Sequence, residues 1–362
     1  MSKRQFKEPL DCRPKRFTRE DGGESVQHFL PMRELRASSN YWLKRLRTST
    51  VITLTGISPS VSVDNDSLVI KQGATLADMA PPTTRYPRGV HRLAWVVIDS
   101  PNGFVTIDAL HWLESQRIGL MMCSGGNTSV LLQHVDKPIV SLRRAQYSGN
   151  VVVIARWVLR GKLAACLDAF PDLPNAQELH ELLHGDTLSQ LVSVNDLRLV
   201  EGRIAGAYWK HHTFTLNHYA KFPPWWSEFD RRSSGIGNTG NRHATHPVNA
   251  ILNYAYTVVA GIVKRHCALL GLDTAVGSLH ADNDRRDSLV WDLLELIRAD
   301  IDKLLLTWMK SVKWRRTDFL TSERGVVSLD TNLRRVVVEK VSTLQSSVER
   351  IVKDYTLFLL RL

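Results

Sequence analysis

The chain has 362 residues, of which 43% are hydrophobic and 23% charged, so it can build sizeable cores and is not disordered by composition. No apolar run reaches about 18 residues, which excludes a membrane-spanning helix. The formal net charge of +11 favours a polyanionic partner, with nucleic acid as the leading candidate, although a merely basic protein is the alternative.

The basic start of the chain lacks the apolar segment of a secretory signal. The 4 cysteines are scattered and form no CxxC pair, so neither a zinc knuckle nor a disulfide framework is indicated. These features favour a reduced, cytoplasmic setting. We interpret residues 1–45, which are polar and basic, as a flexible arm that either attracts phosphates or is an inert tail.

Residues 46–137 are predicted to form a β-rich domain. Alternating apolar residues on both sides of Asn65-Asp66 are the signature of a β-hairpin. Thr106 is placed to cap a short helix. Strands are expected at residues 51–54, 61–63, 68–70, 93–98, 118–122 and 130–132.

Residues 138–362 are predicted to be helical almost throughout, because the apolar period lengthens after Pro138. Gly271 is expected to end one of these helices. The predicted fold class is therefore α+β, with a β-rich N-terminal domain followed by a larger all-α domain. Helices are predicted at residues 139–167 with a break near Gly149, 177–183, 188–211, 249–270, 287–309 and 336–360.

A candidate metal site involves the loop between the helices predicted at residues 249–270 and 287–309 and the second of these helices. His280 is in a polar loop, and Asp292 and Glu295 are three residues apart on the helix that follows, so both carboxylates face the same side. One imidazole and two carboxylates can bind a divalent metal ion. The alternatives are a hydrogen-bonded loop histidine and an ion pair between Glu295 and Arg298.

Glu201 is a second candidate, on the helix predicted at residues 188–211. Its helical neighbours are largely apolar, and a partly buried carboxylate is costly unless something pairs with it. An ion pair, with Arg198 for example, is one interpretation, and a metal-binding or acid–base role is the other.

Three segments together resemble the CRISPR adaptation integrase family, the Cas-one proteins. In chain order they are EGRIAGAYW, HPVNAILNYAY and GLDTAVGSLHADNDRRDSLVWDLLELIR. VITLTGISPSVSVDNDSLVIKQG and GFVTIDALHWLESQRIGLMM resemble the β-rich part of the same family. The resemblance covers about residues 48–335, and the combination of motifs is far more specific than any one of them.

This resemblance implies a β-rich domain joined to a larger α-helical catalytic domain that inserts short duplex DNA into a CRISPR array. It places the metal ligands on Glu201, His280 and Glu295, with Asp292 as a further acidic residue that holds a metal-bound water or orients a ligand. The metal would be Mg²⁺ or Mn²⁺, which favour oxygen ligands, and the imidazole makes Mn²⁺ competitive.

The implied reaction is a transesterification, in which a DNA 3′-hydroxyl attacks a phosphodiester of the repeat. The implied partners are double-stranded DNA, as prespacer and repeat, a second copy of the chain in a homodimer, and a small ferredoxin-like Cas-two subunit. The β-rich domain is expected to make dimer or partner contacts. The alternatives are an integrase that acts without the small subunit and a family member that binds DNA without catalysis.

Several residues near the candidate site could contact DNA phosphates or bases. For each cation the alternative is a solvated surface residue, and for the tyrosine it is a core position. The candidates are Tyr208, Lys210, Arg285, Arg286, Arg298, Lys313, Arg315 and Arg316.

Overall fold

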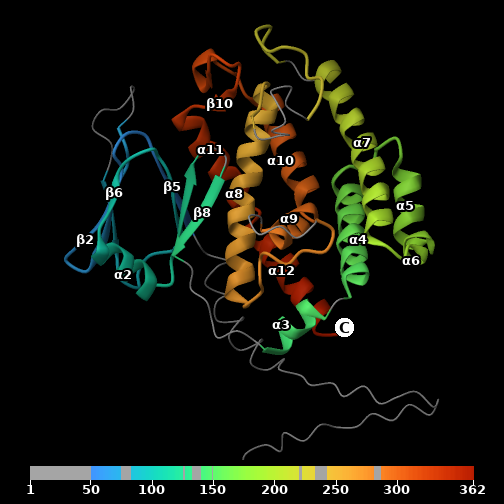
Figure 1. The fold of residues 1–362 in the computed structure, drawn as a ribbon. Coiled ribbons are helices and arrows are strands. Elements are labelled where there is room, and N and C mark those ends of the chain that lie inside the picture. The colour runs from blue at the N-terminus through green and yellow to red at the C-terminus, as the bar shows by residue number, and fades with distance from the viewer. Residues whose placement is uncertain are drawn as a thin grey trace, which may run out of the picture. The chain divides into compact units, whose positions relative to one another are not determined.

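Strands precede helices in the computed structural model of the protein (Figure 1). The structure describes residues 50–74, 83–124, 127–132, 140–148, 150–219, 222–232, 243–280 and 287–362. Strands occupy most of the described chain before Val140, and helices occupy most of it afterwards, which confirms the predicted α+β class. The predicted arm at residues 1–45 lies outside the described residues.

Two four-stranded sheets form the first part of the described chain, with the orders β1-β5-β7-β8 and β4-β3-β2-β6. β1, β5 and β7 pair in parallel, and β8 joins them antiparallel. A short β10-β9 ribbon belongs to the helical part and was not predicted. The strands are β1 (Thr50–Thr55), β2 (Ser60–Asp64), β3 (Ser67–Lys71), β4 (Thr83–Pro87), β5 (Leu93–Asp99), β6 (Phe104–Val105), β7 (Gly119–Ser124), β8 (Asn127–Leu132), β9 (Phe319–Thr321) and β10 (Val327–Leu329).

The β2–β3 hairpin forms at the predicted turn. Asn65 and Asp66 have φ values of 48° and 56°, and a two-residue turn of type I′ requires left-handed backbone at both positions. Thr106 caps α2 (Ile107–Ser115) as predicted, because its side chain accepts a hydrogen bond from the Ala109 amide. Leu68, Val96 and Trp112 belong to one apolar core that joins both sheets to α2.

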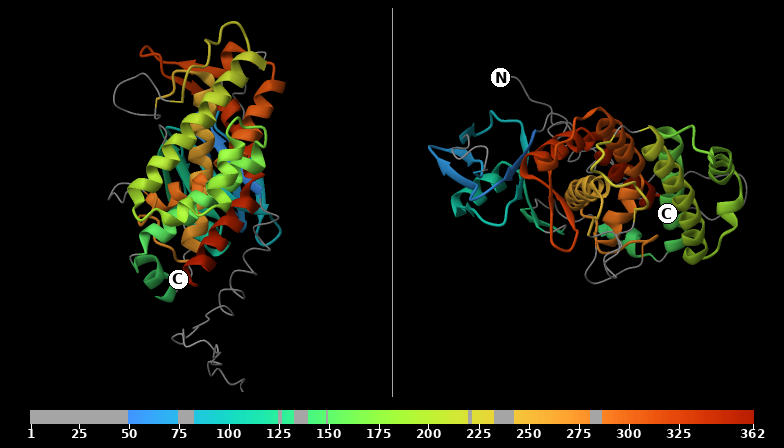
Figure 2. Two further views of the ribbon diagram at one scale, coloured as in Figure 1. Left: turned by 90° about the vertical axis from the view of Figure 1, so that its right-hand side faces the viewer. Right: turned by 90° about the horizontal axis from the view of Figure 1, so that it is seen from above.

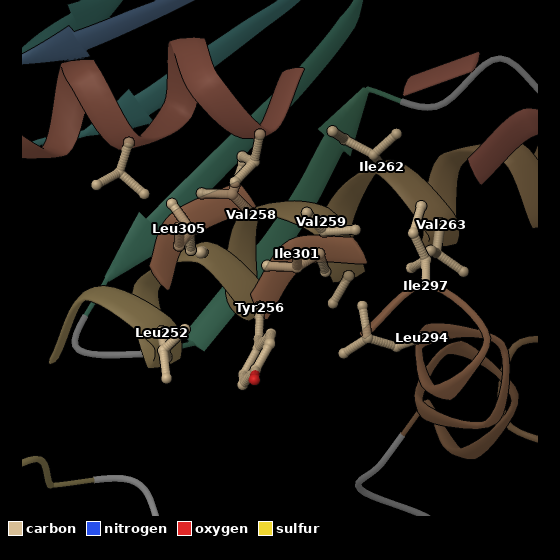
Figure 3. Packing of buried hydrophobic residues seen from close by; sticks show 14 of the residues in the cluster. Leu252, Tyr256, Val258, Val259, Ile262, Val263, Leu294, Ile297, Ile301 and Leu305 are labelled. Atoms are coloured by element: carbon tan, nitrogen blue, oxygen red, sulfur yellow. The ribbon is translucent and has the colours of Figure 1, made fainter. Parts of the chain in front are cut away.

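The helix α8 (Pro247–Leu269) is the centre of the helical part. It contacts β7 and β8 and also α9 to α12 (Figures 1 and 2). Its residues are buried on nearly every face, as expected for a helix that is apolar all round. Figure 3 shows Val259 and Val263 of α8 among Leu294 of α9, Ile301 of α10 and Ile297 between those two helices.

The remaining helices pack around α8 or on the side of α9 and α10 away from the sheets, where α4, α5 and α7 lie together (Figures 1 and 2). They are α3 (Val140–Tyr147), α4 (Val151–Ala169), α5 (Ala176–His184), α6 (Thr187–Gln190), α7 (Val194–Tyr219), α9 (Ser288–Glu295), α10 (Arg298–Ser311), α11 (Thr331–Ser342) and α12 (Gln345–Leu359), with a short 3-10 turn at Arg316–Asp318.

Several predicted helices are broken into two. The helix predicted at residues 287–309 divides at Leu296 and Ile297 into α9 and α10, and the helix predicted at 336–360 divides between α11 and α12. Leu296 packs closely on Gly161 of α4, where an added Cβ would lie 2.8 Å from Leu296 Cγ. The apolar periodicity continues through these breaks, so it could not indicate them.

Asp99, at the end of β5, connects the strands to the helices. It accepts hydrogen bonds from Tyr254 Oη of α8 at 2.7 Å and from Arg334 Nη1 of α11 at 3.0 Å. Leu46–Leu362 form one unit by their contacts, so the division at residue 137 stays a prediction. None of the described helices combines the length and apolar character that crossing a bilayer requires.

Candidate active site

Two of the predicted acidic residues meet around a lysine. Glu201 is on α7, Glu295 is the last residue of α9, and Lys162 comes from α4, which contacts both helices. Lys162 Nζ forms an ion pair with Glu201 Oε1 and a second one, at 2.8 Å, with Glu295 Oε2. Packing therefore brings the two carboxylates to one ammonium group.

Glu295 is buried but remains charged. Its Oε1 lies 2.5 Å from Arg298 Nη1, and its side chain is 3% exposed. Burial raises the pKa of Glu295, but the charges of Arg298 and Lys162 outweigh it and lower the pKa to about 2. The ion pair considered as the alternative for Glu295 and Arg298 therefore forms.

Asp292 organises the loop that carries His280. It is fully buried, and its Oδ2 accepts hydrogen bonds from the Ser278 amide at 2.6 Å, the Ser278 hydroxyl at 3.0 Å and the Leu279 amide at 3.0 Å. Its Oδ1 accepts from the His280 amide at 2.8 Å. The oxygens of Asp292 therefore hold the loop, whereas the two oxygens of Glu295 pair with Lys162 and Arg298.

The imidazole of His280 is oriented by the same carboxylate. His280 Nδ1 lies 2.7 Å from Asp292 Oδ1, and an ionised carboxylate only accepts hydrogen bonds, so Nδ1 carries the hydrogen. In the neutral ring Nε2 then has a free lone pair, the arrangement typical of a metal-ligating histidine. The His280 side chain is 31% exposed, so the site opens to solvent at this residue.

Two further elements hold the histidine loop from outside. Gln146 of α3 donates to the Asp273 carbonyl at 2.6 Å and accepts from the Asp273 amide at 3.0 Å. Arg198 of α7 donates to the Leu279 carbonyl at 2.6 Å. Arg198 was considered as a partner for Glu201, but it binds this loop instead, and Lys162 is the partner of Glu201.

A polar cluster lies beneath the site, around Asp302 of α10. The hydroxyls of Tyr208 and Tyr256 donate to its two oxygens, Tyr208 at 2.9 Å. Burial raises the pKa of Asp302 to about 6, against the opposing effect of these hydrogen bonds and of Arg298. Tyr208 is 6% exposed, so it occupies the core position that was the alternative to DNA contact.

The residues predicted to contact DNA differ in burial and in their partners. Arg298 is directed at Glu295 and at the Tyr256 ring, whose centroid is 5.0 Å away. Arg285 and Arg286 lie outside the described residues. Trp314, next to the candidate Lys313 and Arg315, is buried and donates to the Met309 carbonyl. The exposed candidates are Lys210, Lys313, Arg315 and Arg316.

Glu201, His280 and Glu295, the predicted ligands, do not form a complete metal site in this structure. In the part of the chain that the structure describes, no three His, Cys, Asp or Glu side chains lie close enough to hold one. The donors themselves suit Mg²⁺ or Mn²⁺, since two carboxylates converge and an imidazole is oriented by Asp292. A cation, the Lys162 ammonium, already lies between the two carboxylates and uses one oxygen of each.

Residues 53–343 match the family model described as CRISPR associated protein Cas1. The chain belongs to the Cas1 family.

Individual relatives and structures of this family share less than a third of their aligned residues with the chain. The chain is 29% identical over 242 residues to "CRISPR-associated endonuclease Cas1 2" of Rhodospirillum rubrum, which covers 59% of this chain and 67% of the relative. The fold of the present chain is similar to that of a casposase bound to an integration product. The TM-score is 0.71 at 20% identity, over 86% of this chain and 91% of the casposase chain. The fold is also similar to that of a chain in a Cas6-RT-Cas1–Cas2 complex. The TM-score is 0.56 at 16% identity, over 86% of this chain and 35% of the other.

Lys162 is the site residue that the sequence interpretation missed. It follows Gly161 in a helix whose neighbouring residues Leu159, Leu163 and Cys166 are buried. A lysine on the apolar face of an amphipathic helix is unusual and indicates a buried anion nearby. That signal was present, although it could not say which carboxylates the ammonium would contact.

Asp292→Asn should destabilise the protein by about 2–4 kcal/mol, because the amide nitrogen would face the Ser278 and Leu279 donors and leave one or more buried groups unpaired. Urea unfolding at neutral pH measures this. The exposed Asp354→Asn is the matched control and should change the free energy of unfolding by less than about 0.5 kcal/mol. Equal stability of the two variants would contradict the organising role of Asp292.

Asp302→Asn should alter the pH dependence of stability. The folded pKa of about 6 exceeds the ordinary value of 3.8, so the folded state takes up this proton first as the pH falls. Wild type should therefore gain stability relative to Asp302→Asn between pH 7 and pH 4, by up to about 3 kcal/mol. Urea unfolding of both proteins across this range tests the sign, and a constant difference would refute it.

Proposed function

We propose that this Cas1-family protein is a metal-dependent DNA integrase and endonuclease. It joins the 3′-hydroxyl of short duplex DNA to a phosphodiester of a CRISPR repeat, and thereby inserts new spacers. One phosphorus–oxygen bond forms and one breaks, so no covalent protein intermediate is needed. With water as the nucleophile, the same site would nick DNA.

The observation that carries this proposal is the convergence of Glu201 and Glu295 on Lys162, together with a histidine that Asp292 orients and whose charge acts on Glu295. In a Cas1-family chain, the two glutamates and the histidine lie in the motifs that resemble the family's ligand set. The two carboxylates could hold a divalent ion, and such an ion would stabilise negative charge at a phosphoryl group.

The residues that would hold Mg²⁺ or Mn²⁺ are Glu201, Glu295 and His280 through its Nε2. The bound ion would neutralise charge on the phosphoryl oxygens and favour deprotonation of the attacking hydroxyl. Asp292 keeps the hydrogen of His280 on Nδ1, and Arg298 keeps Glu295 ionised. Glu201 is 27% exposed, so DNA approaches the site from the side of Glu201 and His280.

The proposed partners are double-stranded DNA, a second copy of the chain, and a small Cas2 subunit. The net charge of +11 and the exposed Lys210, Lys313, Arg315 and Arg316 favour phosphate contacts. The fold shared with a Cas1 chain of a Cas1–Cas2 complex supports the Cas2 partner. These assignments belong to the proposal, as do the identity of the metal and its three ligands.

Strand transfer from a short duplex into a repeat-bearing plasmid tests the chemistry. Product should form with Mn²⁺ or Mg²⁺ and fall at least about 100-fold in Glu201→Gln and His280→Ala, because each removes a proposed ligand. The exposed Glu181→Gln is the matched control and should retain wild-type activity. Undiminished product in EDTA would overturn the metal mechanism.

The same assay separates the alternatives. Product without an added Cas2 subunit would identify an integrase that acts alone. DNA binding without product under any condition would identify a non-catalytic family member.

DNA affinity should decrease steeply with salt, since phosphate contacts release counterions. Replacing Lys313, Arg315 and Arg316 together by Ala should lower the slope of log affinity against log salt by about 2–3, if each contacts one phosphate. Fluorescence anisotropy with a labelled duplex measures the slope. The exposed Lys71→Ala, on β3, is the control, and an unchanged slope in the triple variant would exclude this surface from DNA binding.

A further inference from the structure

Lys162 occupies the space between the two carboxylates that would bind a metal ion. Its Nζ pairs with Glu201 Oε1 and Glu295 Oε2, and Arg298 takes the other oxygen of Glu295. The Lys162 side chain is 7% exposed, so water does little to screen its charge. Two negative and two positive charges balance each other in this geometry.

The backbone places Lys162 there through a close helix contact. Gly161, the preceding residue, lies against Leu296, and a side chain at position 161 would overlap it. This contact brings α4 to the junction of α9 and α10, beside Glu295. The neighbouring residues of Lys162 on α4 are apolar and buried, so among the described residues the two glutamates are its ion-pair partners.

A divalent ion and the Lys162 ammonium need the same carboxylate oxygens. Adding two positive charges to a neutral cluster in a poorly solvated site is unfavourable unless the ammonium leaves or an anion arrives. A pocket of about 30 Å³ beside Lys162, lined also by Cys166, Ile204 and Tyr208, has room for about one water molecule. It offers no anion besides Glu295, so a phosphate must come from outside.

We infer that Lys162 couples metal binding to DNA binding, an inference that rests on the proposed function. In the free protein Lys162 neutralises Glu201 and Glu295 and keeps the affinity for divalent ions low. A DNA phosphate at the site draws the ammonium away from the carboxylates, and the site then takes the ion. By linkage, the ion strengthens DNA binding by the same factor.

Mn²⁺ titration followed by electron paramagnetic resonance tests this without any turnover. The probe DNA is a short duplex with dideoxy 3′ ends, which binds but cannot be joined. For the wild type the duplex should tighten Mn²⁺ binding at least about tenfold. In Lys162→Met, Mn²⁺ should bind at least about tenfold more tightly than in wild type without DNA, and the duplex should add less than about threefold.

The exposed Lys303→Met, on α10, is the matched control and should behave as wild type. Lys162→Gln keeps a hydrogen-bonding group and should show the same pattern if the Met variant fails to fold. In addition, Mn²⁺ should raise the thermal unfolding temperature of the Lys162 variants more than that of wild type, because the ion replaces the lost countercharge.

Equal or weaker Mn²⁺ binding by both Lys162 variants would overturn the inference and leave the proposed metal centre intact. The same holds for an undiminished effect of DNA in these variants. An absence of Mn²⁺ binding in every protein, with and without DNA, would overturn the proposed metal centre as well.

Discussion

Charge compensation of buried carboxylates is the constraint on which the site depends. Asp292, Glu295 and Asp302 all lie in the α9–α10 segment and are almost inaccessible to water. A buried carboxylate is tolerated only when donors or cations surround it. The loop amides and His280 surround Asp292, two cations surround Glu295, and two tyrosine hydroxyls surround Asp302. The positions of the loop, of α4 and of α7 follow from these partners.

The fold was largely predictable because local rules act on adjacent residues. The Asn65-Asp66 turn, the Thr106 cap and the end of α8 before Gly271 each depend on a few neighbouring side chains. The break between α9 and α10 was not predictable, since the apolar periodicity continues through it, and its close contact with Gly161 of another helix is not a local feature. That break matters for function, because it places Arg298 at the start of α10 beside Glu295 at the end of α9.

The residue types of the candidate site were predictable, but the hydrogen bonds and ion pairs between its side chains were not. His280, Asp292 and Glu295 are close in sequence, and helical spacing alone shows that they can share a face. Spacing could not show that Asp292 accepts the hydrogen bonds of the histidine loop while Glu295 pairs with two cations. Lys162 is far from both glutamates in the chain, so its role depends on helix packing that no local pattern encodes.

The positive charges of the protein serve two physically different purposes. Lys162 and Arg298 compensate buried carboxylates, so they act on the charge state of the site and are poorly placed to attract distant DNA. Lys210, Lys313, Arg315 and Arg316 are exposed, where salt screens them and where phosphates can reach them. Sequence composition counts all of these residues equally toward the net charge. Ion pairs with the buried Glu295 distinguish Lys162 and Arg298 from the four exposed cations, a difference that composition alone cannot show.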